Sequence, residues 1–358
     1  MSARTTGQVR VVGTGLLGTS IGLGLSSLAV DVVLDDVSPS SLALAVDYGA
    51  GRPTGPEDAP SLVVVAVPPD VVAEVVVAEL TRYPEAMVTD VASVKAAPLA
   101  ALNAAGAQVE RYLGSHPMAG RERGGPIAAR ADLFLARPWV IAPHAGSTPE
   151  QAGVLEALAL DLGAVPVRLP AERHDDAVAV VSHVPQLVSS LLAARLVDAP
   201  DHATDLAGQG LRDTTRIAAS APALWVQILS ANAARILPVL SDLRDDLDAV
   251  LEALADPSAR GAQRALADVL AAGNDGVARI PGKHGVDLKT TTLVVLVNDR
   301  PGQIARLLTE IGELGVNLED MRLEHSPGAP VGIVEIAVAP EVAGGLEADL
   351  AARGWRMA

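Results

Sequence analysis

The chain has 358 residues, more than one hydrophobic core usually serves, so we expect two or three domains. The formal net charge of −16 and a total of three Trp, three Tyr and one Phe argue against partners such as nucleic acid or an anionic membrane. Zero cysteines exclude disulfides, thiolate catalysis and Cys-ligated zinc. The seven histidines form no HxxxH pair, so we expect no bound metal.

Near the N-terminus, Arg4 and Arg10 precede twenty uncharged residues, 11–30, which could be mistaken for a signal peptide or a membrane span. Ten of the twenty are Gly, Ser or Thr, which is too polar for an inserted segment. We therefore expect a cytoplasmic protein.

The first 168 residues have the pattern of an α/β domain. Short apolar runs at 8–12, 31–35, 61–67, 86–91 and 138–142 predict strands, and 16–29 predicts a helix of small residues. Continuous apolar runs such as SLVVVAV are typical of strands that are buried on both faces. The expected fold is a Rossmann-type, doubly wound parallel sheet.

Two further domains follow. Residues 169–280 are rich in Ala and Leu at helical spacing, which predicts an all-helical domain that buries its apolar face against a second copy in a homodimer. Residues 273–288 have the Gly and charge content of a linker. Strands at 290–297, 316–324 and 331–339, helices at 301–314 and 341–353, a Ser-Pro-Gly turn and a short last strand predict a βαββαβ sandwich over 289–358.

A glycine-rich loop lies between the first predicted strand and helix. It fits the GxGxxG pattern, whose backbone N–H groups meet a pyrophosphate at the positive end of the helix. The pattern alone is weak evidence, but the strand before it and the helix after it support a dinucleotide site. The expected cofactor-binding residues of this loop are Gly13, Thr14, Gly15, Leu16, Leu17 and Gly18.

An acid at the end of the second strand favours NAD. Asp36 is expected to bond the ribose hydroxyls, with Asp35 as a competitor and helix capping as the alternative for either. No Arg lies between Arg10 and Arg52 to receive a 2′-phosphate, so NAD is favoured over NADP. Val67 and Pro68 close a later strand, either beside the nicotinamide ribose or simply as the end of the strand.

Two polar segments, TDVASVK at 89–95 and GSHPMAGRE at 114–122, are expected at the edge of the sheet where ligands bind. His116 is suited to act as a general base because an unperturbed histidine is largely neutral at cellular pH. Ser93 is expected to bond the ring nitrogen that does not face the substrate, which would fix the tautomer.

With these motifs the chain resembles the prephenate and arogenate dehydrogenases of tyrosine biosynthesis, the TyrA family. The resemblance spans essentially the whole chain. It rests on several motifs in order: GxGLLGxSIGLGL at 13–25, TDVASVK at 89–95, GSHPMAGRE at 114–122, HDDAVAVVSHVP at 174–185 and LRDTTRIA at 211–218.

The resemblance implies a role for each matched residue. His116 resembles the base that takes the proton of the ring hydroxyl as hydride leaves for the nicotinamide, and Ser93 resembles its orienting partner. Loss of the ring carboxylate and aromatisation would drive the reaction. Glu122 resembles a residue that gates the site or forms a polar wall beside it, and His183 resembles a substrate-contacting histidine. Trp225 resembles a residue that lines the site from the partner subunit, with packing in the core as the alternative.

The residues that bind the substrate leave its identity open. Arg212 and Arg216 share one face if their segment is helical, and surface ion pairs are the alternative reading of the pair. The resemblance favours Arg216 as the clamp of a substrate carboxylate, which matches the planar fork of a guanidinium. Gln186 stands where the family often has a second histidine. This departure leaves the choice between prephenate and arogenate open.

The C-terminal sandwich resembles an ACT domain, a sensor of small ligands in amino-acid metabolism. The resemblance rests on the loop NDRPG at 298–302 and on GVNL at 315–318. It implies an allosteric site that includes Asp299, Arg300, Gly302 and Asn317, with tyrosine as the expected effector. A plain dimerisation module is the alternative.

Two other functions fit parts of the sequence. A β-hydroxyacid or imine dehydrogenase would also join a Rossmann domain to a helical domain, but those enzymes typically use a lysine and have no HPMAG segment. A non-catalytic NAD-responsive regulator would bind NAD without turnover, and the combination of Ser93, His116 and Arg216 argues against it.

Overall fold

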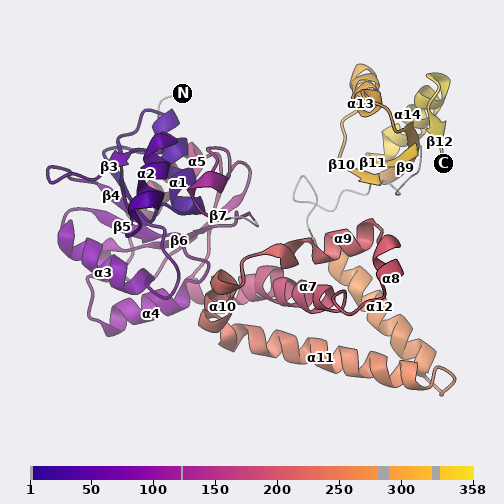
Figure 1. The fold of residues 1–358 in the computed structure, drawn as a ribbon, viewed down its shortest axis with the longest axis horizontal. Helices are drawn as coiled ribbons and strands as arrows, with labels where there is room; N and C mark the ends of the chain where they lie inside the picture. The colour runs from indigo at the N-terminus through magenta and orange to yellow at the C-terminus, as the bar shows by residue number, and fades with distance from the viewer. Residues whose placement is uncertain (1–2, 122–123, 281–289, 325–330) are drawn as a thin grey trace. The chain divides into compact units, whose positions relative to one another are not determined.

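The computed structural model describes residues 3–121, 124–280, 290–324 and 331–358. They form two compact units (Figure 1). The first comprises Met1–Val197 and Thr215–Asp242, and the second comprises Asp198–Thr214 and Leu243–Ala358. The first unit thus takes in residues 169–197 and 215–242 of the predicted helical domain, and the second takes in the rest.

A five-stranded parallel sheet forms the centre of the first unit. Its strands, in the order β3-β2-β1-β4-β5, are β1 (Val9–Val12), β2 (Val32–Asp35), β3 (Arg52–Pro53), β4 (Leu62–Val65) and β5 (Met87–Asp90). The predicted doubly wound sheet is confirmed, and the strand order reverses between β1 and β4, where such sheets bind their ligands.

Both faces of this sheet are covered. Leu62 and Val64 of β4 belong to one buried cluster, and Val63 and Val65 belong to another. This explains the continuous apolar runs in the sequence. The surrounding helices are α1 (Leu16–Ser27), α2 (Pro39–Asp47), α3 (Val72–Arg82), α4 (Ala96–Ala104) and α5 (Pro149–Asp161), with short 3₁₀ turns η1 (Val109–Arg111) and η2 (Pro126–Ala128).

A second sheet corrects the predicted place of residues 138–142. These form β7 (Pro138–Ala142), which pairs antiparallel with β6 (Gly114–Pro117) and parallel with β8 (Val165–Arg168), rather than joining the parallel sheet. A parallel bridge between Val88 and Tyr112 holds the start of β6 beside β5. His116 therefore lies within a strand at this junction, paired with Val140.

The helices of the first unit include an uninterrupted run from 171 to 194. It comprises α6 (Ala171–Val178), the π-helical turn η3 (Ala179–His183) and α7 (Val184–Ala194), and it is followed later by η4 (Arg216–Ala219) and α10 (Pro222–Ala231). Pro185 has no N–H to donate to a carbonyl of the preceding turn. The wider π-helical turn just before it accommodates this missing hydrogen bond.

By length and composition alone, this run of 24 residues could cross a membrane, as could the bent pair of α10 and the following helix. The run nevertheless carries the buried polar side chains of His174, Asp175 and His183, which bond to other parts of the unit. Such buried polar contacts are those of a helix packed within a protein core.

The second unit contains helices and a small sandwich. The helices are α8 (Asp201–Asp205), α9 (Gln209–Thr215), α11 (Ala233–Ala255) and α12 (Ala262–Ala278), of which α9 and α11 cross between the units. The predicted linker over 273–288 is wrong in its first part, since α12 continues through Gly273 and Gly276 to Ala278. Residues 281–289 of that linker lie outside the described residues.

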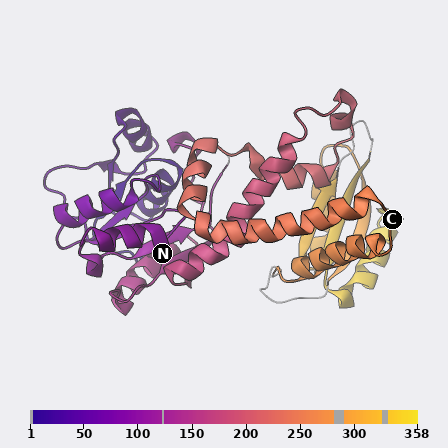
Figure 2. The same ribbon diagram turned by 90° about the horizontal axis from the view of Figure 1, so that it is seen from below.

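The sandwich has the predicted βαββαβ order. Figure 2 shows its strands side by side in gold and yellow. It comprises β9 (Thr291–Asn298), α13 (Gln303–Glu313), β10 (Asp320–Glu324), β11 (Val331–Val338), α14 (Pro340–Ala352) and β12 (Arg356–Met357), with the antiparallel strand order β10-β11-β9-β12. Apolar side chains of both helices and of the inner strands form its core. The predicted Ser-Pro-Gly turn lies outside the described residues.

Candidate active site

The loop after β1 is built for a phosphate group. A Cβ atom on Gly13, which has φ +96°, would lie 2.4 Å from the carbonyl oxygen of Ala66, and one on Gly18 would lie 1.9 Å from the carbonyl oxygen of Gly13. Strand, loop and helix therefore approach more closely than a side chain allows. A Cβ on Gly15 would meet nothing within 4 Å, and Gly15 gives α1 no side-chain cap. The first N–H groups of α1 thus remain available to an anion.

The two acids at the end of β2 have different partners. Asp36 accepts hydrogen bonds from the backbone N and the hydroxyl of Thr14, at 2.6 and 2.8 Å, and from the backbone N of Ser38 at 2.7 Å. Asp35 instead pairs with the fully buried guanidinium of Arg10. Asp36 is therefore the acid tied to the glycine-rich loop, and its contact with a ribose stays a prediction.

The segment after β4 lies against the same loop. Val67 approaches Gly13, since its Cγ1 would lie 3.1 Å from a Cβ placed there. Pro68, the next residue, is exposed. Asp70 in this segment accepts a 3.1 Å hydrogen bond from the amide of Gln227 in α10, which connects the sheet to a helix of the same unit.

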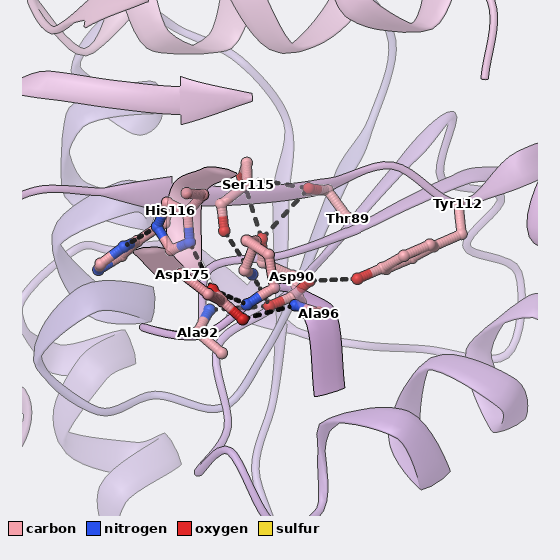
Figure 3. A network of polar contacts seen from close by, with 10 residues as sticks. Thr89, Asp90, Ala92, Ala96, Tyr112, Ser115, His116 and Asp175 are labelled. Carbon is pink, nitrogen blue, oxygen red and sulfur yellow. Dashed lines mark hydrogen bonds and ion pairs between the residues drawn. The ribbon is translucent and has the colours of Figure 1, made fainter. Parts of the chain in front are cut away.

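His116 belongs to a chain of three buried side chains (Figure 3). Its Nδ1 lies 2.9 Å from Nε2 of His174, and Nδ1 of His174 lies 2.7 Å from Oδ1 of Asp175. All three are less than a tenth exposed. Burial, followed by the nearby titratable side chains of His174, Lys95 and His183, holds the pKa of His116 well below its ordinary value, so this imidazole is neutral at cellular pH.

Asp175 is fixed from several directions. Its carboxylate also accepts hydrogen bonds from the backbone N of Lys95 at 2.8 Å and of Ala96 at 2.9 Å, at the start of α4. Its backbone carbonyl accepts a 2.8 Å bond from the amide of Asn232. Burial alone would raise the pKa of the Asp175 carboxyl, but the bonds from His174, Ala96 and Lys95 lower it below its ordinary value, and the group is ionised.

A second buried cluster holds the strand that carries His116. Asp90 forms a short ion pair with Lys95 and accepts from the hydroxyl of Tyr112 at 2.6 Å and the backbone N of Ala92 at 2.9 Å. Lys95 Nζ donates to the carbonyl oxygen of Ser115 at 2.7 Å. Lys95 thus connects the loop after β5 to the residue that precedes His116.

The structure gives His116 a different ring partner from the one predicted. Among the described residues, no hydrogen bond joins Ser93 to the His116 ring, and Nδ1 is occupied by His174. Ser93 is half-buried in the same loop as Lys95. The place assigned to Ser93 is thus taken by a side chain from α6. A direct role of Ser93 toward the substrate stays a prediction.

His183 lies close to this chain. Its Nδ1 accepts a 3.1 Å hydrogen bond from the amide of Asn232, and its ring meets Trp225 edge to face, with centroids 6.1 Å apart. Burial lowers the pKa of His183 to about 4, against which the charge of Asp175 acts only in part. Trp225, predicted to reach the site from the partner subunit, thus contacts His183 of its own chain.

The other predicted substrate residues are less closely gathered. Gln186 is buried in α7, with its amide 3.4 Å from the hydroxyl of Ser190. Arg216 is exposed at the start of η4, which packs against α7. Arg212 lies in α9, and the α-helix ends at Thr215, so the two arginines do not share one regular helix as predicted. Glu122 lies outside the described residues.

Three residues of the site had no role assigned from the sequence. His174 and Asp175 are the adjacent pair at the start of HDDAVAVVSHVP, and Asn232 ends α10 and bonds both Asp175 and His183. A His-Asp pair is a recognisable signal for an oriented imidazole. Asn232 gives no comparable signal, because its role depends on contacts with residues about fifty positions away.

In the sandwich, the predicted effector residues occupy two loops. Asp299, Arg300 and Gly302 connect β9 to α13, and Gly302 has φ +86° at the start of that helix. Asn317 precedes β10, and its amide lies 3.3 Å from Oε1 of Glu319.

Comparison with known proteins shows what this arrangement is similar to. Two family models match in succession: prephenate dehydrogenase, nucleotide-binding domain, over residues 23–168, and prephenate dehydrogenase, dimerization domain, over residues 170–270. The probable prephenate dehydrogenase NovF of Streptomyces niveus is 36% identical, with 96% of this chain and 98% of that protein covered.

Solved structures agree in fold. The arogenate dehydrogenase of Synechocystis is 26% identical with a TM-score of 0.60, and the match covers 75% of this chain and 99% of that one. The prephenate dehydrogenase of A. aeolicus, solved in complex with hydroxyphenyl propionate and NAD+, is 24% identical with a TM-score of 0.65, and covers 75% of this chain and 98% of that one.

Proposed function

Since the chain belongs to the prephenate dehydrogenase family, we propose that it catalyses the NAD-dependent oxidative decarboxylation of prephenate to 4-hydroxyphenylpyruvate, with His116 as general base. The observation that carries the proposal is a buried, neutral imidazole at the junction of the two sheets. A neutral imidazole can accept a proton at physiological pH, and its surroundings hold it in one orientation.

The residues of the glycine-rich loop fit NAD. The open side of Gly15 and the uncapped start of α1 suit its pyrophosphate, and Asp36 suits its ribose. When bound, NAD supplies a hydride acceptor. His116 accepts the proton of the ring hydroxyl as the hydride leaves the same ring carbon. The ring carboxylate then departs as CO₂, its bonding electrons make the ring aromatic, and a proton returns to the phenol oxygen.

The substrate is an anion in an acidic protein, so local donors must bind it. We propose that Arg216 clamps one carboxylate with its guanidinium fork. His183 accepts from Asn232 at Nδ1, which leaves the proton of the neutral ring on Nε2 as a donor. Gln186 adds a neutral amide in place of the second histidine that the family resemblance implied.

Arogenate is the second candidate substrate. One specific observation favours it: both His183, at the end of η3, and Gln186, in α7, are neutral, so these two buried side chains offer no cation to the second carboxylate of prephenate. Arogenate carries an ammonium group beside that carboxylate, and a neutral site penalises this pair of charges less than it penalises a lone anion.

The deciding experiment is to mix the purified protein with NAD and with prephenate or arogenate in turn, and to follow NADH formation by absorbance. Turnover of prephenate with 4-hydroxyphenylpyruvate as product supports the proposal. Turnover of arogenate alone, with tyrosine as product, favours the second candidate. NAD binding without turnover of either would refute both.

We propose that the chain works as a cytoplasmic homodimer. One of the two matching family models describes a dimerization domain. On α11, Leu243, Leu247, Leu251 and Leu254 recur at helical spacing and are 40 to 57% exposed. Such an apolar stripe is typical of a helix that packs against a partner. Light scattering coupled to size exclusion measures the mass directly.

A further inference from the structure

We propose that His174 and Asp175 are positioning residues that keep the proton of the His116 ring on Nδ1, so that Nε2 is the atom that receives the substrate proton. The proposal rests on the proposed function for its catalytic meaning, but the proton's position can be measured without any substrate. It follows from the three side chains of His116, His174 and Asp175, each of which is within hydrogen-bond distance of the next.

The direction of each hydrogen bond follows from what each group can do. The ionised Asp175 carboxylate can only accept, so Nδ1 of His174 must carry a proton toward it. In a neutral His174 ring, Nε2 then has a lone pair and no proton. At 2.9 Å from this lone pair, Nδ1 of His116 must be the donor. The remaining nitrogen of His116, Nε2, is left with the free lone pair that a general base needs.

Asp175 can fix the direction of these hydrogen bonds because its carboxylate is held against rotation. Three hydrogen bonds converge on its carboxylate: one from His174 and two from the backbone N–H groups of Lys95 and Ala96. Asn232 holds its backbone as well. Rotation of the carboxylate would leave two buried N–H groups without acceptors, a loss of the kind that buried structures avoid.

The same chain also stabilises the product of proton transfer. When His116 becomes an imidazolium, its Nδ1–H still has an acceptor in His174, and the carboxylate of Asp175 lies one ring further on. Among the described residues, burial and the titratable side chains of His174, Lys95 and His183 disfavour a positive charge on His116. The ionised carboxylate of Asp175, at the end of the chain, acts in the opposite direction through its negative charge. The logic is that of an acid holding a catalytic histidine in one tautomer, here extended by a second ring.

Two substitutions at one position separate the hydrogen bond from the packing. His174→Phe keeps a ring in the cavity but removes the acceptor for His116. His174→Gln places an amide oxygen near the position of Nε2 and can restore that acceptor. We expect His174→Phe to lower kcat by about 10- to 1,000-fold with little change in the Kd for NAD, a loss no larger than that for removal of a general base. His174→Gln should recover a substantial part of kcat.

The matched control is His202→Asn, which changes an exposed histidine of α8. It should leave kcat unchanged. If His174→Phe binds NAD normally and turns over like the wild type, the positioning role is refuted. Equal losses in the Phe and Gln variants also refute it, because a purely structural role would not distinguish the amide oxygen from a phenyl ring.

A spectroscopic measurement tests the inference even if neither substrate is turned over. In full-length protein with ¹⁵N-labelled histidine, long-range proton–nitrogen correlations report which ring nitrogen is protonated. The His116 signals are identified by their absence in His116→Asn. We expect a proton on Nδ1 and a bare Nε2 in the wild type, and loss of this preference in His174→Phe. A proton on Nε2, or on both nitrogens at neutral pH, would overturn the inference, while failure of both substrates would refute only the proposed function.

Asp175→Asn gives an independent check at the end of the chain. An amide has one acceptor oxygen and one donor group, so it cannot satisfy His174, Lys95 and Ala96 together. We expect a fall in kcat of about 10-fold or more and a mixture of His116 tautomers. Wild-type kcat together with an unchanged tautomer in this variant would show that Asp175 does not set the proton's position.

Discussion

The buried ion pair between Lys95 and Asp90 is the contact whose loss should be easiest to measure. The side chains are 1% and 0% exposed, and Asp90 is further bonded to Tyr112 and to a backbone N–H. Burial lowers the pKa of Lys95, and the Asp90 charge acts against that shift. Lys95→Met keeps the length and apolar stem of the side chain but removes the ammonium group.

This change leaves the Asp90 carboxylate buried without its counter-charge. Breaking a buried ion pair in this way usually costs about 3–5 kcal/mol. For a cooperative unit of this size, that corresponds to a fall of about 6 to 20 °C in melting temperature. Differential scanning calorimetry of the full chain measures it, and the transition of the first unit is identified as the one that moves upward when NAD is added.

The control variant is Arg130→Met, which removes a surface pair with Asp132, both side chains being more than half exposed. It should leave the melting temperature of that transition nearly unchanged, because solvent screens such pairs. If Lys95→Met has the same melting temperature as the control and the wild type, Asp90 is not an unpaired buried charge in the variant. The described contacts would then not explain how the loop after β5 is held.

Three further predictions concern the site. His116→Asn should lower kcat by about 100- to 10,000-fold with little change in the Kd for NAD, and near wild-type turnover would remove His116 from the mechanism. Asp36→Ser should weaken NAD binding and narrow its advantage over NADP in steady-state kinetics, and equal use of both cofactors by the wild type would contradict the assignment. The pKa of His183 is lowered to about 4 in the folded protein, whereas an unfolded histidine has a pKa of about 6.5. Between these two pH values protonation favours the unfolded chain, so the free energy of unfolding should fall as pH drops from 6.5 toward 4. His183→Gln should flatten that dependence in urea unfolding, and an unchanged slope would contradict it.

Much of the fold could be predicted because its signals are local. The strands β1, β2, β4 and β5 are largely buried, and each contains a short apolar stretch in the sequence, which is uninterrupted over the whole strand in β4. The strands β6 and β8 were missed for the opposite reason. GSHP is short and largely polar although it is buried, and VPVR is mostly exposed and contains a proline. Their pairing with β7 depends on contacts between distant segments, which no local pattern reports.

The candidate site divides in the same way. The glycine-rich loop and Asp36 were predictable because spacing along the chain determines their geometry. The partner of His116 was not, since His174 lies 58 residues away and reaches it only through the packing of α6 against the sheet. Ser93 is nearer in the predicted sheet but has no bond to the ring among the described residues. The sequence thus predicted His116 as the base, but it gave no local signal that His174 is the side chain bonded to its ring.

The last prediction concerns regulation by the sandwich. Its loop from Asp299 to Gly302 ends at the start of α13, which has no side-chain cap, so its first N–H groups can bind the carboxylate of an amino acid. The amide oxygen of Asn317 can accept a hydrogen bond from the amine, while its amide nitrogen donates to Glu319. Both family models end by residue 270, which suggests that a chain ending at Ile280 keeps its catalytic part.

Tyrosine, the expected product of the pathway, should therefore inhibit the full chain more strongly than the chain ending at Ile280. A coupling of about 1–3 kcal/mol between the sandwich and the catalytic unit would raise the inhibition constant about 5- to 150-fold on truncation, with kcat retained. Initial rates measured over a range of tyrosine concentrations give both constants. The alternative is that tyrosine, which resembles the product, competes directly at the active site. In that case the truncated enzyme would remain as sensitive as the full chain, because the competing site would be intact in both, and the sandwich would have no part in the response.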